Sequence, residues 1–274
     1  NADFNGDLDV DGTTNLDAVD VDGAVNFAAD VTFADGADII TASAGTSNFR
    51  AGSGAGDSIA SGGNYNVAVG DNSGTAITTG DENVFVGFKA GFGTTTSGQN
   101  IAIGSGALET NILGSHNVGI GNAALATMNQ GTATNTYNTA VGSGAGGAMT
   151  TGIRNTLIGS TAGDALTDAD YNVAIGMGAL TADTLGSKSV AIGHSALEAQ
   201  NFTTATDSYN IAIGDNTGKA ITTGRMNNLI GGIAGDALTS GNSNIAIGYS
   251  ALSSDTLGDN SVAIGDQALA AQNF

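Results

Sequence analysis

The residues of this chain that could do chemistry are few, and aspartates are the most prominent among them. Near the start, Asp7, Asp9 and Asp11 stand at alternate positions before Gly12. This D-x-D-x-D-G order is the opening of a calcium-binding loop, in which carboxylate oxygens at alternate positions coordinate the ion. The twelfth position of such a loop holds a bidentate Glu, but here it is Ala18. The alternation is therefore more typical of a solvated strand face than of a calcium site.

The two histidines and a recurring pair of aspartates are the other candidates for metal binding or catalysis. His116 and His194 lie at different places in the repeat described below, with no Cys or repeating acid beside them. Both are expected at the surface. Asp164 and Asp236 recur at equivalent positions, as catalysis by paired carboxylates would require, but Phe92 holds that position in the first block. These aspartates are expected to be turn residues, and we predict no cofactor and no enzyme activity.

Composition limits the core that the chain can build. Its 274 residues include 44 Gly, no Pro, no Cys, no Trp and 5% aromatic residues, too little bulk for an ordinary globular interior. Yet 41% of the residues are hydrophobic and only 12% are charged, unlike a disordered chain. A thin, repetitive core is expected. Without cysteines, its stability must come from backbone hydrogen bonds and assembly.

Charge and hydropathy argue against two classes of partner. Six Lys and Arg against 26 Asp and Glu give a formal net charge of −20, which repels nucleic acids and anionic membranes. No segment approaches the roughly 20 consecutive apolar residues that span a bilayer. The chain starts without Met or a signal-peptide pattern and stops inside a repeat, so a piece of a longer protein is expected.

A pentapeptide of the form N-x-A-V/I-G recurs along the chain. Its copies start at positions 66, 83, 100, 117, 138, 155, 172, 189, 210, 227, 244 and 261. The intervals are 17, 17, 17 and 21 residues, and this order recurs to give a 72-residue block. Tyr65, Tyr137 and Tyr209 precede the first copy in each block.

Each pentapeptide predicts one turn of a solenoid. The V-A-V or I-A-I core alternates as a short strand does, and the Gly after it can adopt the positive φ of a tight turn. A second apolar pair at a variable offset, such as Ala107-Leu108 or Ala76-Ile77, predicts a second short strand. At ~3.3 Å per residue, 17 residues complete one flattened coil, and coils would stack ~4.8 Å apart in parallel.

The Asn that opens most pentapeptides is expected to stack on its counterparts in a ladder of side-chain amides. Ser189 and Ser261 replace it in equivalent turns, so the ladder must tolerate a hydroxyl.

The middle residue of each strand indicates assembly. It points away from its two neighbours, and in a monomeric solenoid the outward face should be polar. No polar residue occupies the middle position. We therefore expect the middle residues to face identical chains around a symmetry axis, with a homotrimer favoured over a dimer. The expected trimer interface is Ala68, Phe85, Ala102, Gly119, Ala140, Leu157, Ala174, Ala191, Ala212, Leu229, Ala246 and Ala263.

The longer turns are the expected sites of contact with a partner. QGTATNTY (130–137) and NFTTATDSY (201–209) lie in the turns that gain four residues, and loops on rigid scaffolds commonly carry recognition. The alternative is that they are simply longer turns. Asp183 and Asp255 are expected to be exposed turn residues. The residues expected to contact a host-surface glycan or protein are Gln130, Thr132, Asn135, Tyr137, Asn201, Phe202, Thr204, Asp207 and Tyr209.

The N-terminal segment has another rhythm. Residues 1–50 hold short apolar alternations such as Leu8-Asp9-Val10, spaced by six residues with one step of five, which predict a hexad-repeat β-helical shaft. A Gly/Ser-rich linker over 51–63 would join it to a β-roll repeat domain over 64–274. The predicted fold is thus all-β, a parallel β-solenoid assembled as a homotrimer.

The segment NVAIGMGALTADTLGSKSVAIGHSAL (172–197) resembles two related groups of proteins. These are the left-handed β-roll heads of trimeric autotransporter adhesins and the NTAIG-type repeats of phage tail-fibre proteins. The resemblance covers residues 64–274, and the 17-residue spacing with Asp-rich hexads is more similar to the phage fibres. It implies a trimeric, host-facing, extracellular fibre.

We therefore expect a structural phage tail-fibre segment for host attachment, with a bacterial surface adhesin or filament as the alternative. A hexapeptide-type acyltransferase, suggested by the hexads, would need a catalytic His at a coil corner, and residues 1–50 contain none.

Overall fold

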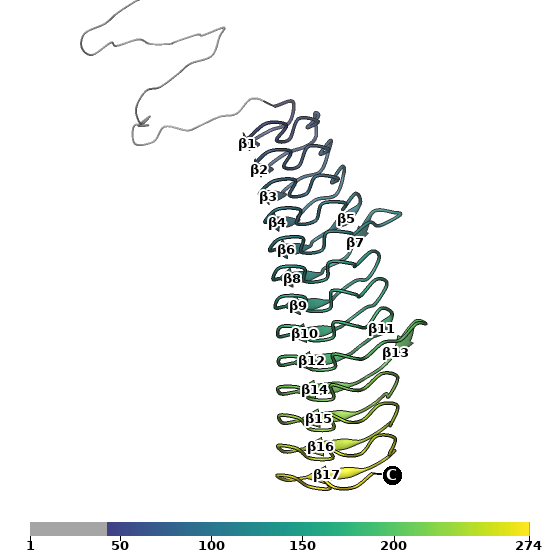
Figure 1. Ribbon diagram of the computed structural model, residues 1–274. Helices are drawn as coiled ribbons and strands as arrows, with labels where there is room; N and C mark the ends of the chain where they lie inside the picture. Colours follow the sequence, from purple (N-terminus) through teal and green to yellow (C-terminus); the bar gives the residue numbers. More distant parts are fainter. Residues whose placement is uncertain (1–42, 274) are drawn as a thin grey trace, which may run out of the picture. The chain divides into compact units, whose positions relative to one another are not determined.

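The computed structural model describes residues 43–273, which form a stack of short turns joined by a parallel sheet (Figure 1). The sheet has 13 strands in sequence order. They are β1 (Phe49–Ala51), β2 (Val67–Val69), β3 (Val84–Val86), β4 (Ile101–Ile103), β6 (Val118–Ile120), β8 (Thr139–Val141), β9 (Thr156–Ile158), β10 (Val173–Ile175), β12 (Val190–Ile192), β14 (Ile211–Ile213), β15 (Asn228–Ile230), β16 (Ile245–Ile247) and β17 (Val262–Ile264). The predicted parallel β-solenoid is confirmed.

Neighbouring strands pair residue for residue, so that equivalent repeat positions lie above one another. Ala174 of β10, for example, pairs with Ala191 of β12. Two shorter parallel pairs accompany the long turns: β5 (Gly114–Ser115) with β7 (Thr134–Asn135), and β11 (Gly186–Ser187) with β13 (Thr206–Asp207). The 17/17/17/21 spacing therefore sets the register of the whole stack.

The stack begins one turn earlier than predicted. Phe49 of β1 pairs with Val67 of β2, and the side-chain Oδ1 of Asn48 accepts a hydrogen bond from the Asn66 backbone N at 2.8 Å. Residues 51–63 are therefore part of the first turn and not a linker. The rest of the predicted shaft, with the candidate calcium ligands Asp7, Asp9 and Asp11, lies outside the described residues.

The predicted second strand in every turn was wrong. Within the described stack, only the two long turns, with β7 and β13, and the turn before each of them, with β5 and β11, hold a second strand; every other turn holds one. The second apolar pair lies in a tight bend, because Leu108 has a left-handed φ of 51°. Gly74 takes the same position, with a φ of 55°, in a turn where Ile77 fills the core instead. This exchange of Gly for Leu explains the variable offset seen in the sequence.

The middle residues of the strands lie inside the solenoid, and their prediction as a trimer interface was wrong. The bend after each strand folds back over them, so a second chain cannot reach them. Phe85 shows how closely they pack: a Cβ at Gly91 would stand 2.5 Å from its ring. The residues corrected in this way are Ala68, Phe85, Ala102, Ala140, Leu157, Ala174, Ala191, Ala212, Leu229, Ala246 and Ala263, all at 0 or 1% exposure, and buried Gly119.

The predicted amide ladder is present and buried. Asn83 Oδ1 accepts from the Asn100 backbone N at 3.0 Å, and Asn100 Nδ2 donates to the Gly114 carbonyl at 3.0 Å. A buried amide needs such partners for both of its ends. The ladder thus satisfies polar groups that a parallel stack would otherwise leave unpaired.

At Ser189 a second amide repairs the ladder. Gln200 Nε2 donates to Ser189 Oγ at 2.8 Å, and Gln200 Oε1 accepts from Asn210 Nδ2 at 2.8 Å. In the first block the equivalent positions hold Asn117 and Met128. The hydroxyl is tolerated because the glutamine amide takes up the missing bonds.

Candidate functional site

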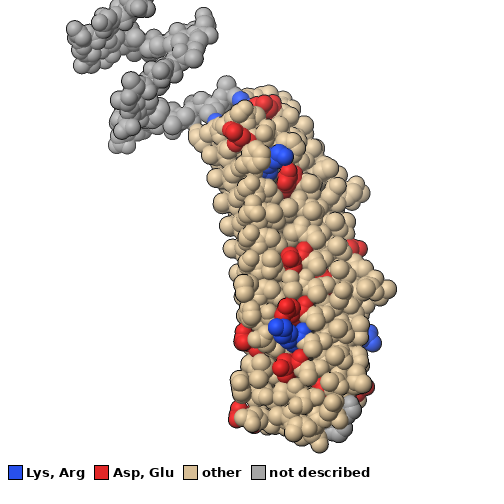
Figure 2. All heavy atoms as spheres, viewed as in Figure 1, with Lys and Arg blue, Asp and Glu red and all other residues tan. Residues whose placement is uncertain are grey.

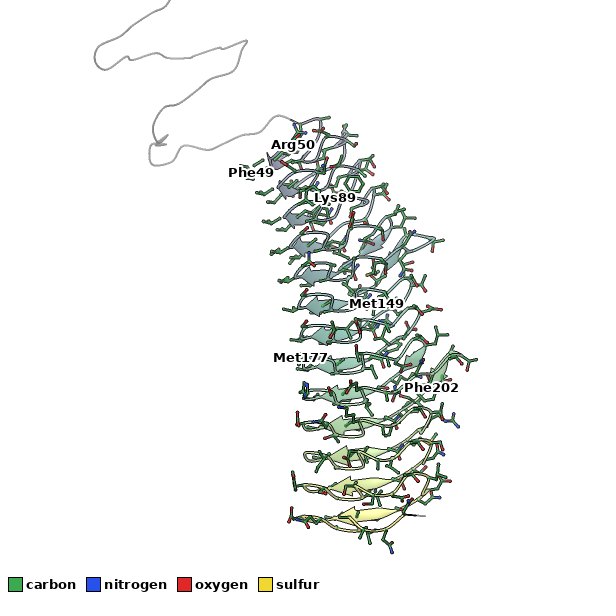
Figure 3. The ribbon with its side chains drawn as sticks, viewed as in Figure 1. Phe49, Arg50, Lys89, Met149, Met177 and Phe202 are labelled. Atoms are coloured by element: carbon green, nitrogen blue, oxygen red, sulfur yellow. The ribbon has the colours of Figure 1, made fainter. Side chains whose placement is uncertain are left out.

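The outward face of the main sheet is apolar. In the twelve strands from β2 to β17, the first and third residues are Val or Ile at 21 of 24 positions, the others being Thr139, Thr156 and Asn228. These side chains are half-buried or exposed in the single chain; Ile103, for example, is 38% exposed. We call these 24 positions the Val/Ile face. Phe49 and Met177 project on the strand side of the stack (Figure 3).

The Val/Ile face holds no charged residue. Charged side chains in view gather in small clusters and leave most of the stack uncharged (Figure 2). A parallel sheet is normally covered on both faces, and contiguous apolar patches mark interaction sites. The Val/Ile face is therefore the first candidate surface.

The two long turns project beside β7 and β13 (Figure 1). Their predicted contact residues divide into two groups. Gln130 and Phe202 are buried, at 7% and 6% exposure, where the long turns leave the stack. Their prediction as contact residues was therefore wrong. Phe202 lies in the segment between β12 and β13, close to the β11–β13 pair (Figure 3). Exposed residues are Thr132, Asn135, Tyr137, Asn201, Thr204, Asp207 and Tyr209.

A line of side chains runs along the corner just before the Asn ladder. Tyr137, Tyr171 and Tyr209 stand two turns apart, 46%, 46% and 48% exposed. Between them, Arg154 donates to the Tyr171 hydroxyl, and Lys188 Nζ lies 5.2 Å from the Tyr209 ring centroid. We call these five residues the tyrosine line.

Residues 154, 171 and 188 were missed from the sequence, although all stand one position before a pentapeptide. That shared position was the signal that could have found them.

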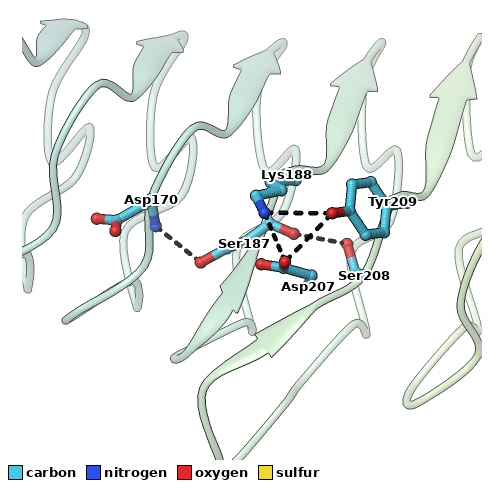
Figure 4. A network of polar contacts seen from close by, with 6 residues as sticks. All are labelled: Asp170, Ser187, Lys188, Asp207, Ser208 and Tyr209. Atoms are coloured by element: carbon cyan, nitrogen blue, oxygen red, sulfur yellow. Dashed lines mark hydrogen bonds and ion pairs between the residues drawn. The ribbon is translucent and has the colours of Figure 1, made fainter.

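Lys188 joins this line to the second long turn (Figure 4). Its Nζ lies 2.5 Å from Asp207 Oδ2 and donates to the Tyr209 hydroxyl at 3.2 Å, and that hydroxyl donates to Asp207 Oδ2 at 3.2 Å. The hydrogen bond between them raises the pKa of Lys188 and lowers that of Asp207. Both groups are therefore charged at neutral pH, and the pair fixes the orientation of the turn.

Two grooves lie against the long turns at equivalent places in successive blocks. Groove A, of about 370 Å³, includes Thr96, Gly98, Ser115 and Asn135 in its lining. Groove B, of about 630 Å³, includes Asp168, Asp170, Ser187 and Asp207. Each member of the second set follows its counterpart by 72 residues. The block repeat has thus duplicated a polar groove.

The buried carboxylate of Asp183 was also misassigned. Asp183 and Asp255 are at 0% exposure, not exposed turn residues. Asp183 Oδ1 accepts from the backbone N of Gly186 and Phe202, both at 3.0 Å, and Oδ2 accepts from Gln200 Nε2 at 2.6 Å. Burial raises the pKa of Asp183 despite these bonds. The residue closes the base of the long turn and is not accessible to a ligand.

The remaining candidates are not brought together. His116 lies before a strand, its ring 4.7 Å from that of Tyr137, whereas His194 follows a strand and its Nδ1 lies 3.0 Å from Asp215 Oδ1. Asp164 accepts a hydrogen bond from the Thr181 hydroxyl. Burial raises the pKa of Asp236. Each of these residues has only local contacts, and no shared site forms from them.

In residues 43–273 no group of three or more His, Asp or Glu side chains is placed to hold a metal ion. Over the same residues, the structure has no helix that could cross a membrane. Comparison of the chain with protein-family models, with curated proteins and with solved structures gave no match.

Proposed function

We propose that this chain is a segment of an extracellular trimeric fibre for host attachment, most similar to a phage tail fibre, in which three stacks pack through their Val/Ile faces. The observation that carries the proposal is the face itself: 21 β-branched apolar residues in two rows, interrupted only at Thr139, Thr156 and Asn228 in the row of first positions. Covering such rows removes apolar surface from water, at ~25 cal/mol per Å². The interface proposed from the sequence is thus moved to the opposite side of the same strands.

A second copy of the chain fits this face better than an unrelated protein would. The rows repeat with every turn, about 4.8 Å apart, over twelve successive strands. A partner must match that interval over the whole length, and an identical stack does so by construction. The three-fold symmetry is proposed from the resemblance to trimeric fibres, as is the extracellular location.

The mass of the assembly tests the proposal. Sedimentation should give about three times the chain mass of 26.6 kDa. Replacing Ile103 and Ile175 with Lys should yield a folded monomer, because the lysines face outward and cannot be buried unpaired between chains. The matched control replaces Thr139 and Thr156 of the same face with Ser. A wild-type monomer with native β-sheet signal at micromolar concentration would contradict the proposal.

A further inference from the structure

Grooves A and B share one chemistry. Groove A is lined by hydroxyl, carboxylate and amide groups, including those of Thr96, Glu82 and Gln99. Groove B is lined by Asp168, Asp170 and Ser187, with Tyr209 at its edge. Such side chains combine donors with acceptors, the pattern needed by a ligand whose hydroxyl groups both donate and accept.

The carboxylates of groove B retain acceptor capacity. Asp168 Oδ1 accepts from the Thr151 hydroxyl at 2.6 Å, and Asp170 Oδ1 accepts from the Ile153 backbone N at 2.8 Å. Within the described residues, Oδ2 of both aspartates makes no hydrogen bond to the protein. A carboxylate held by one oxygen is well placed to accept from a ligand hydroxyl with the other.

Charge selects the class of ligand. The chain carries −20, and Asp168, Asp170 and Asp207 line groove B, so anionic ligands are repelled. Lys188 pairs with Asp207 and Arg225 lines the same groove, so two cations offset the three carboxylates and a cationic peptide gains little there. These charges therefore favour a neutral ligand. To bond the many donors and acceptors of the groove lining, that ligand must carry many hydroxyl groups.

The tyrosine line supplies the apolar part of such a site. Tyr137, Tyr171 and Tyr209 expose about half of their surface and stand two turns apart, roughly 9.6 Å for parallel strands. This interval is close to the repeat of two sugar units in an extended β-linked chain. One face of each ring is covered by His116, Arg154 or Lys188, and the C–H face of a sugar can pack on the other while its hydroxyls reach polar neighbours.

From these observations we infer that grooves A and B are equivalent binding sites for a neutral, linear, β-linked glycan that lies along the stack. The inference rests on the proposed attachment function and names its ligand. One glycan chain can occupy both grooves, since they are one block, or four turns, apart. Such double occupancy strengthens weak single contacts.

The test titrates the full chain by calorimetry with neutral hexasaccharides of β-glucan, β-mannan and β-galactan. An oligogalacturonate hexamer and hexalysine are the acidic and basic probes. At least one neutral hexasaccharide should bind, with one molecule spanning both grooves, and the matching disaccharide, which is too short to span four turns, should bind at two sites per chain. Asp168→Ala combined with Tyr209→Ala should remove one of the two sites, and Thr96→Ala combined with Gln99→Ala should remove the other.

Tyr249→Ala is the matched control, because this tyrosine is 59% exposed but follows a strand instead of preceding one. It should leave binding unchanged, whereas Tyr209→Ala alone should weaken groove B about tenfold. The inference is overturned if no neutral probe binds, if only the acidic or basic probe binds, or if Tyr249→Ala weakens binding equally. A monomer that binds glycan contradicts only the assembly, and a trimer that binds none contradicts only this inference.

Discussion

At the scale of single residues, the interior is specified by polar groups as much as by apolar ones. Asp183 with Gln200 occupies the place that Asn111 and Met128 hold one block earlier. Asn111 satisfies itself locally, donating from Nδ2 to the Gly114 carbonyl at 2.8 Å, whereas Asp183 needs the glutamine amide. The two positions therefore change together between blocks: Asn111 with Met128 in one, Asp183 with Gln200 in the next. The first block thus shows which double substitution should be compatible in the second.

Asp183→Asn alone should lower the free energy of unfolding at pH 7 by about 1–3 kcal/mol, because two amide donors would then face each other. Asp183→Asn with Gln200→Met should recover much of that loss by reproducing the first block. Thermal unfolding of the single and double variants checks this coupling. Equal losses in both would mean that the two residues act independently.

The raised pKa of Asp183 also gives a pH dependence. The folded state holds this proton more tightly than the unfolded state, whose pKa is about 3.8. The contribution of Asp183 to stability is therefore largest below that pH and falls as the pH rises through the folded-state pKa. We compare the wild type with the double variant Asp183→Asn/Gln200→Met. The free energy of unfolding of the wild type minus that of the variant should be larger at pH 4 than at pH 7. An unchanged difference between the two would refute the assignment.

Gly176 shows the constraint on the residue that ends each strand. Its φ is 137°, and a Cβ there would lie 2.3 Å from the Gly193 carbonyl oxygen of the next turn. Gly176→Ala should therefore destabilise the stack by several kcal/mol, from strain and steric overlap together. Gly131→Ala is the control, since nothing lies within 4 Å of its Cβ position. Chemical denaturation of both variants measures the contrast.

At the scale of the strand, stability depends on matching large middle residues with small neighbours. Leu157 of β9 fits because Gly163 opposes it; a Cβ there would stand 2.8 Å from Leu157 Cδ2. Ala174 of the next strand is followed by Leu180 instead. The core therefore changes shape after every second turn, with two Gly turns followed by two Leu turns.

Ala174→Leu should overpack this core and cost roughly 1–3 kcal/mol. Because Ala174 is buried within one chain, the loss should not depend on protein concentration. Unfolding midpoints at two concentrations a hundredfold apart provide the measurement. If the loss of stability appeared only at the low protein concentration, Ala174 would instead lie at the interface between chains.

Each long turn is a removable element. Deleting residues 131–134 and 203–206 would restore 17-residue turns while keeping the buried anchors Gln130 and Phe202. Loop changes of this kind cost little, so the stack should remain folded, as circular dichroism would show. Host-surface binding should weaken, because groove B loses Ala205 and Thr206 and the turn that carries Asn135 of groove A is shortened. Unchanged binding would make the turns spacers.

The repeat, the strand register and the Asn ladder were predictable from the sequence because spacing alone determines them. The inward face was not, because V-A-V has two apolar faces and the residues that cover one of them, such as Leu108, act through a bend with positive φ. The first turn was missed because Arg50 replaces the usual Ala; its Nη1 donates to the Gly56 carbonyl at 3.0 Å. The grooves could not be predicted, because their lining residues come from several successive turns and no single sequence motif contains them.

At the scale of the whole stack, each turn contacts mainly the turns beside it, so stability should grow by nearly equal increments with length. Removing residues 203–274 should leave the preceding turns folded, with a lower unfolding midpoint and a smaller dependence of free energy on denaturant. Urea unfolding of the two lengths compares them directly. Complete unfolding of the shortened chain would show that the stack is not modular.

The direction of the backbone hydrogen bonds has a mechanical consequence. Bonds such as that from Val118 N to the Asn138 carbonyl, at 2.9 Å, join one turn to the next along the axis of the stack. Tension applied along that axis loads them one turn at a time instead of shearing many together. A stretched stack should therefore peel in steps, each releasing about 17 residues or roughly 60 Å of contour. Such a rod yields gradually under a sudden pull and absorbs the load.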